Sequence, residues 1–222
     1  VSFAPDSNEP KVVITSCAAL CTRLVDGTTG QIISRVQHSL PPGAMTHYDA
    51  NTVVVAEWGS LSLWDMRTGK GNKPGHRLTV ERTPILAMDC LGDTVGATGE
   101  SRLITLYDSR IWRSKKSWKP AVKHDCVGIK LNARKCFVAG LDHELVCDAL
   151  VESSADKNSS KQPVTFKLNA TPQSVPEGSM LYQNHRMFRS ESRWAGFDIA
   201  NSFCEDGALV PFIGLAESGV MY

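Results

Sequence analysis

The sequence predicts an all-β protein built from repeats of about 40 residues, and three observations support this. A strand-like phrase, LSLWDMRTG at 61–69, alternates apolar and polar residues and ends on Asp65 before a Thr-Gly turn. Related phrases end on Asp26, Asp108 and Asp148, so that the four aspartates recur at intervals of 39, 43 and 40 residues. The chain also lacks any long stretch with the 3.6-residue period of a helix.

A repeat of this length, with a strand that ends in Trp64-Asp65, resembles the WD-repeat β-propeller family. In that family each repeat forms a blade of four antiparallel strands, and the third strand carries the Trp-Asp ending. The resemblance implies a propeller with short loops around a central channel. About five blades of this propeller lie in the chain. Because the chain begins on a first strand and stops on a third strand, we expect it to be part of a larger, seven-bladed propeller.

The elements of each blade follow from β-branched and apolar runs that are separated by turn residues. Blades are expected near 1–40, 41–82, 83–123, 124–169 and 194–222. Strands are predicted at 1–6, 11–16, 20–26 and 31–36 in the first blade and at 45–48, 52–56, 60–65 and 76–80 in the second. The third has 85–89, 94–98, 102–108 and a segment near 118–122, and the fourth has 127–131, 136–139, 144–148 and 164–168. The fifth has 194–199, 209–214 and 220–222, while 151–162 is a polar loop and 170–193 an insertion with a short strand at 180–182.

The bulk composition gives no sign of a protein that binds nucleic acid or membranes through its overall charge. The chain of 222 residues has 24 Lys or Arg against 23 Asp or Glu, so it has no overall field that would attract nucleic acid or an anionic membrane. Its apolar runs fall short of the ~18 residues that cross a bilayer. Seven cysteines, an odd number and mostly in strand-like segments, predict thiols in an intracellular protein of the cytoplasm or nucleus.

The sequence shows no pattern of residues that would carry a reaction. Cys17 and Cys21 have no second pair of Cys or His at a metal-ligand spacing. The chain also contains no phosphate-binding glycine loop, nucleophile elbow or paired-carboxylate site. We therefore expect no enzyme activity, no catalytic residue, no bound metal or cofactor and no small-molecule substrate.

Histidines recur at a suitable distance from the strand-ending aspartates. In WD repeats a His before the first strand often joins the Asp of the third strand in a buried network. The resemblance implies three such pairs, separated by 27, 32 and 24 residues: His38 with Asp65, His76 with Asp108, and His124 with Asp148. Because the pairing recurs by blade without a nucleophile, we expect these networks to satisfy buried polar groups rather than to catalyse a reaction.

Two arginines, Arg67 and Arg110, each lie two residues beyond a strand-ending aspartate. The tetrapeptides Trp64-Asp65-Met66-Arg67 and Tyr107-Asp108-Ser109-Arg110 resemble the Trp-Asp-x-Arg box of substrate receptors for cullin-4 ubiquitin ligases. The resemblance implies that both arginines contact a ligase subunit. The alternative is that each arginine packs locally within its own blade.

The stretch 110–123 is strongly basic and is predicted to be a loop between the third and fourth strands of the third blade. It has six basic residues and no acid, with two tryptophans between them: Arg110, Trp112, Arg113, Lys115, Lys116, Trp118, Lys119 and Lys123. Such a loop suits an acidic protein, or RNA whose phosphates attract the cations and whose bases stack on indole rings. The alternative is a solvated loop whose tryptophans are tucked into the blade.

Together these features predict a non-enzymatic scaffold or adaptor that binds other proteins in a multi-subunit complex. One alternative is a substrate receptor of a cullin-4 ubiquitin ligase that uses Arg67 and Arg110. Another is an RNA-associated propeller in ribonucleoprotein assembly that uses the basic stretch.

Overall fold

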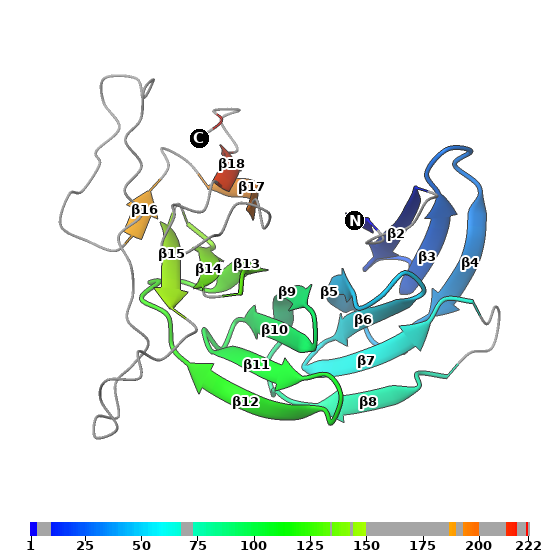
Figure 1. Ribbon diagram of the computed structural model, residues 1–222, viewed down its shortest axis with the longest axis horizontal. Coiled ribbons are helices and arrows are strands. Elements are labelled where there is room, and N and C mark those ends of the chain that lie inside the picture. The colour runs from blue at the N-terminus through cyan, green and yellow to red at the C-terminus, as the bar shows by residue number, and fades with distance from the viewer. Residues whose placement is uncertain are drawn as a thin grey trace.

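The computed structural model describes residues 1–3, 10–67, 73–133, 135–142, 144–149, 187–189, 193–199, 212–216 and 221. Within these residues the regular secondary structure consists of β-strands, which confirms the all-β prediction. Four sheets have four antiparallel strands each, in the order of the sequence, and a two-stranded pair follows them. Figure 1 shows the sheets side by side around an arc, with β5 and β9 towards the inside and β8 and β12 at the outside.

The strands of the first two sheets cover the first 79 residues of the chain. The first sheet has β1 (Ser2–Phe3), β2 (Lys11–Ser16), β3 (Cys21–Asp26) and β4 (Ile32–Gln37). The second has β5 (Pro42–His47), β6 (Thr52–Glu57), β7 (Ser60–Asp65) and β8 (His76–Thr79).

The remaining strands repeat this order. The third sheet has β9 (Ile85–Leu91), β10 (Thr94–Gly99), β11 (Ile104–Asp108) and β12 (Arg113–Trp118). The fourth has β13 (Cys126–Leu131), β14 (Lys135–Gly140), β15 (Glu144–Ala149) and β16 (Met187–Arg189). The final pair is β17 (Trp194–Ile199) and β18 (Phe212–Ala216), and Met221 forms an isolated bridge with Leu215.

The outer strands of the third and fourth sheets differ from the prediction. The outer strand of the third sheet is β12 at Arg113–Trp118 rather than 118–122, because a short turn returns the chain directly along β11. Part of the basic stretch that was expected to be a loop, Arg113–Trp118, is therefore a strand. In the fourth sheet β16 pairs with β15. The strands predicted at 164–168 and 180–182 and the loop at 151–162 lie outside the described residues.

The core lies between neighbouring sheets, and the second strand of each sheet shows why. Along β6, Val53 and Val55 pack against the first sheet, whereas Val54 and Ala56 pack against the third. Successive residues of a strand point to opposite faces, so a strand between two packed sheets needs apolar residues at nearly every position. The equivalent strands β10 and β14 are likewise buried from their second residue onwards.

The repeated strand order gives the arc two rims. We call one the Asp rim: it is formed by the connections from first to second and from third to fourth strands, where β3, β7 and β11 end on aspartates. We call the other the His rim: it is formed by the turns from second to third strands and by the connections between sheets, where His38 and His124 lie. The chain passes itself closely at the His rim, since a Cβ atom on Gly59 would collide with the carbonyl oxygen of Glu81.

Candidate functional site

The aspartates that end the third strands close the same small turn in three successive sheets. In each turn, the Oδ1 atom accepts the backbone N–H two residues further on, over 2.8 Å at Asp26, 2.9 Å at Asp65 and 3.0 Å at Asp108. A short carboxylate suits this role because it can take the place of a backbone carbonyl in a turn. The residue after each aspartate also donates its N–H to the carbonyl before the second strand: Gly27 to Pro10, Met66 to Asn51, and Ser109 to Asp93. The repeated aspartate therefore helps to join the two connections of its sheet at the Asp rim.

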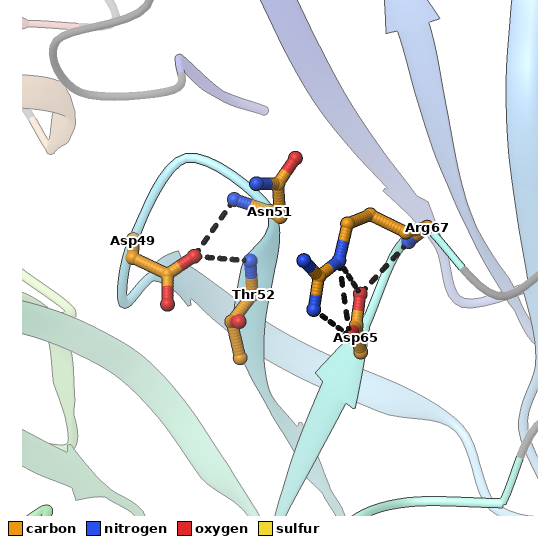
Figure 2. A network of polar contacts seen from close by, with 5 residues as sticks. All are labelled: Asp49, Asn51, Thr52, Asp65 and Arg67. Atoms are coloured by element: carbon orange, nitrogen blue, oxygen red, sulfur yellow. Dashed lines mark hydrogen bonds and ion pairs between the residues drawn. The ribbon is translucent and has the colours of Figure 1, made fainter.

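In the second sheet Arg67 folds back onto the aspartate, as Figure 2 shows. The Nε atom of Arg67 lies 3.0 and 3.2 Å from the two carboxylate oxygens of Asp65, and Nη2 lies 2.6 Å from Oδ2. The side-chain and then the backbone hydrogen bonds of Arg67 lower the pKa of Asp65 to about 2. Because the arginine side chain is 67% exposed, this ion pair lies at the surface.

The neighbouring turn between β5 and β6 is fixed by a second aspartate. The Oδ1 atom of Asp49 accepts the backbone N–H groups of Asn51 and Thr52, each over 2.8 Å (Figure 2). The carbonyl of Asn51 accepts the N–H of Met66 in turn. Hydrogen bonds thus join the turn between β5 and β6 to the turn after β7. The backbone that carries Arg67 is therefore held in place.

In the third sheet the equivalent arginine is held more loosely. The Nε atom of Arg110 lies 3.5 Å from Asp108 and 3.5 Å from Asp93, and the side chain is 66% exposed. The second carboxylate oxygen of Asp108 is 3.3 Å from Nζ of Lys115, which also lies 3.4 Å from Oγ1 of Thr94. A lysine from β12 therefore takes the position that the guanidinium occupies at Asp65.

The basic stretch forms the outer edge of the third sheet. Among the described strands β12 pairs with β11 alone, and its register shifts around Lys115, which is the extra residue of a bulge. Basic side chains and bulges are two features by which edge strands avoid pairing with other chains. Arg113 and Lys119 are exposed, so the outer edge presents cations to solvent.

The two tryptophans of this stretch are already engaged within the fold. Trp118 is 7% exposed in the core between the third and fourth sheets, and Nζ of Lys116 lies 6.0 Å from its ring centroid. Trp112 has a positive φ of 50° and stacks on His76 of β8, with ring centroids 5.5 Å apart and planes inclined by 25°. His76 thus contacts the third sheet through an aromatic stack rather than through the predicted pair with Asp108.

His38 is bonded to a different acid from the one predicted. Its ring is buried, and Nδ1 donates to Oε1 of Glu57 over 3.2 Å while Nε2 lies 2.7 Å from Oγ1 of Thr22. The pairing predicted with Asp65 is wrong because the two residues lie at opposite rims. Six residues of β7 separate that aspartate from the His rim, a distance of roughly 17 Å at ~3.3 Å per residue. Glu57 also lies 3.6 Å from Nη2 of Arg77, so the network joins the first two sheets.

His124 repeats this arrangement in the fourth sheet. Its Nε2 lies 2.9 Å from Oδ2 of Asp142, with side chains 44% and 37% exposed. Asp148 lies near the other end of β15, and its side chain is outside the described residues. In both sheets the acid follows the His by 18 or 19 residues and stands where the second strand ends. That spacing is a sequence signal that could have identified Glu57 and Asp142.

Within the described ranges, no group of three or more His, Cys, Asp or Glu side chains is arranged to hold a metal ion. No helix in that part of the chain is long and apolar enough to cross a membrane. The described cysteines are thiols rather than disulfides: Cys17, Cys21, Cys90, Cys126, Cys136 and Cys147. Burial, followed by the charges of Asp89 and Asp93, raises the pKa of Cys90 to about 12 and so keeps this thiol unreactive at neutral pH.

No protein-family model matches the sequence, and no curated protein matches it. Solved structures do match the fold. A structure of U3-55K superimposes with a TM-score of 0.55 at 10% sequence identity, covering 65% of this chain and 46% of that chain. A crystal structure of the RRP9 WD40 repeats gives a TM-score of 0.55 at 11% identity, again covering 65% and 46% of the two chains.

The chain has the fold of a WD40-repeat β-propeller. It covers about half the length of the WD40 structures that it matches. At this level of identity the likeness establishes the architecture, and function has to be argued from the residues of the site. The WD40 fold places Arg67 and Arg110 on the Asp rim of neighbouring sheets and places His38 and His124 on the His rim.

Proposed function

We propose that this WD40 propeller is a non-enzymatic scaffold that binds other proteins through its Asp rim. The observation that carries this proposal is the pair of arginines, Arg67 and Arg110, at equivalent positions of two neighbouring sheets with side chains 67% and 66% exposed. Arginine is enriched among the residues that dominate protein–protein binding energy. The hydrogen-bonded turns beneath both arginines reduce the ordering cost of binding.

An intracellular location without catalysis fits the remaining chemistry of the chain. The six described thiols suit a reducing compartment. The buried histidine network is satisfied by groups of the protein itself, which suits a structural role. We therefore assign the propeller to the inside of the cell, in a multi-subunit complex.

Quantitative co-purification tests the scaffold proposal. The full chain is expressed in cells, and its partners are measured by mass spectrometry for the wild type and for the double variant Arg67→Ala/Arg110→Ala. We expect at least one abundant partner to fall by about tenfold or more, the loss that a binding hot spot produces. The matched control is Arg35→Ala, which removes an exposed arginine of β4 and should leave the partner in place. Equal recovery with wild type and double variant would overturn the proposal.

A substrate receptor of a cullin-4 ubiquitin ligase is the second candidate. The observation that favours it is the repeated Asp-x-Arg spacing at the ends of β7 and β11, with both arginines at the same rim. Its test is direct binding of the purified chain to the purified adaptor subunit of these ligases. Saturable binding that the double variant loses would support the receptor, and the absence of binding would eliminate it while leaving the scaffold proposal intact.

RNA binding through the basic stretch has weaker support. Trp118 is buried and Trp112 stacks on His76, so both indoles of the stretch are engaged within the protein. Lys115 is paired with Asp108, which reduces the positive charge that a phosphate would meet.

A further inference from the structure

The two Asp-x-Arg boxes share a spacing but differ in what their arginines do. Three contacts of 2.6–3.2 Å commit the guanidinium of Arg67 to Asp65. The closest contacts of Arg110 run through Nε at 3.5 Å, because Lys115 occupies the other oxygen of Asp108. Arg67 therefore mainly closes its own turn. The terminal nitrogens of Arg110, in contrast, are available to a partner.

The turn that carries Arg110 projects an apolar side chain from the rim. Ile111 is 63% exposed at the tip between β11 and β12, and exposed arginines precede and follow it in the sequence, at Arg110 and Arg113. Arginine is enriched in binding hot spots, and an exposed aliphatic side chain can be the anchor that fills a pocket of the partner. The turn between β7 and β8 extends into residues outside the described ranges and shows no equivalent tip within them.

The tip is also rigid before any partner arrives. The N–H of Trp112 donates to the carbonyl of Asp108 over 2.6 Å, and the N–H of Ser109 donates to the carbonyl of Asp93 over 3.0 Å. Trp112 has a positive φ of 50°, which bulky residues adopt when their surroundings hold them there. Its stack on His76 fixes the turn against the second sheet. Little conformational freedom is left to lose on binding.

We propose that the turn 109–113 is the anchor of the Asp rim. Ile111 fills an apolar pocket of a partner protein, and Arg110 and Arg113 pair with carboxylates that border the pocket. Arg67 borders this anchor on the same rim, where its bonds to Asp65 leave it a smaller part in binding than Arg110 and Arg113. The inference rests on the proposed scaffold function and specifies the chemistry of its partner.

The composition of the turn favours a protein over RNA. An exposed isoleucine at the tip gains most from an apolar pocket, which a phosphate backbone does not provide. Asp93 and Asp108, which lie within 3.5 Å of Arg110, would oppose phosphates and carboxylates alike, so the preference for a protein rests on the apolar tip.

Site-specific photo-crosslinking of the full chain tests the anchor. A photoreactive phenylalanine analogue replaces Ile111 in one variant, and replaces Ile32 on β4 or Leu141 on the His rim in two controls that are 55% and 42% exposed. We expect one defined protein adduct from position 111, at least tenfold above both controls. The crosslinked peptide of the partner should contain Asp or Glu beside apolar residues. Adding Arg110→Ser/Arg113→Ser should reduce the adduct at least tenfold, whereas adding Arg67→Ser should change it by less than twofold.

The outcomes separate the anchor from the scaffold proposal. An adduct from position 32 or 141 with none from position 111 would overturn the anchor and leave a scaffold that docks elsewhere. The absence of an adduct at all three positions would overturn the anchor, while the co-purification experiment decides the scaffold proposal separately. An adduct at 111 that survives the loss of both arginines, or that ribonuclease removes, would overturn the proposed partner chemistry. Circular dichroism of each variant checks that it is folded. In a charge exchange, the variant Arg110→Glu should lose the adduct, and replacing the partner's crosslinked carboxylates with Lys should restore it.

Discussion

Glu57 is the residue on which the polar junction of the first two sheets depends. Its carboxylate accepts a hydrogen bond from His38 and lies near Arg77, and its side chain is 1% exposed. Burial opposes its ionisation, but the contacts with His38, Ser62 and Arg77 together outweigh burial, so that the pKa of Glu57 lies below its ordinary value. The exposed equivalent in the fourth sheet, His124 with Asp142, has the same kind of contact in a more solvated place.

The substitution Glu57→Gln should therefore destabilise the fold by about 1–3 kcal/mol, because it removes the charge that compensates buried donors. The matched control Asp142→Asn should cost less than about 1 kcal/mol, as exposed ion pairs do. Urea unfolding of both variants measures the difference. Equal losses would show that burial at the His rim does not set the strength of these contacts.

A second prediction concerns the ion pair between Asp65 and Arg67. The pKa of Asp65, about 2, lies below the ordinary 3.8, so its contribution to stability is complete above pH 3.8 and is lost as the pH falls towards 2. Asparagine still accepts the turn N–H through its amide oxygen, so Asp65→Asn isolates the charge. We expect this variant to lower Tm slightly at pH 6, by the equivalent of less than about 1 kcal/mol, and to match the wild type at pH 2. A Tm difference that is as large at pH 2 as at pH 6 would contradict this.

At the scale of elements, sequence patterns predict a strand that packs between sheets better than a basic edge strand. β7 is predicted with its observed bounds, because both of its faces pack against neighbouring sheets and so demand an apolar pattern. β12 lies at the edge of its sheet and is largely exposed to solvent. Its Lys and Ser residues therefore give the polar pattern that predicts a loop. The acid partners of His38 and His124 were missed for a related reason: residue spacing alone does not tell which rim a side chain reaches.

Close packing at the His rim gives an element-scale prediction. A Cβ on Gly59 would collide with the backbone carbonyl of Glu81 in the connection from β8 to β9. Gly59→Ala should therefore destabilise by about 1–3 kcal/mol, as overpacking does. Gly75→Ala is the matched control, because its new Cβ would meet its nearest neighbour, the carbonyl oxygen of Leu63, at 4.0 Å. Thermal unfolding decides, and a Gly59 variant as stable as the Gly75 variant would refute the packing argument.

At the scale of the whole molecule, the buried junctions between sheets stabilise the fold, whereas the exposed Asp rim is available for binding. Each junction between neighbouring sheets has its own apolar cluster, and the buried histidine network reinforces one of them. The Asp rim instead presents exposed arginines on turns that backbone hydrogen bonds hold in place. This division matches a scaffold whose packed sheets hold a rim in position for a partner.

Hydrogen–deuterium exchange of the chain alone and in complex with its co-purified partner tests the docking surface most directly. In the free chain, amides in the buried strand β6 should exchange slowest and those of exposed turns fastest. On complex formation we predict slower exchange in the Asp-rim turn 109–113, with a smaller effect at 65–67 and none in β6. Slower exchange at the His-rim turns 58–59 and 100–103, with the Asp rim unchanged, would contradict the account.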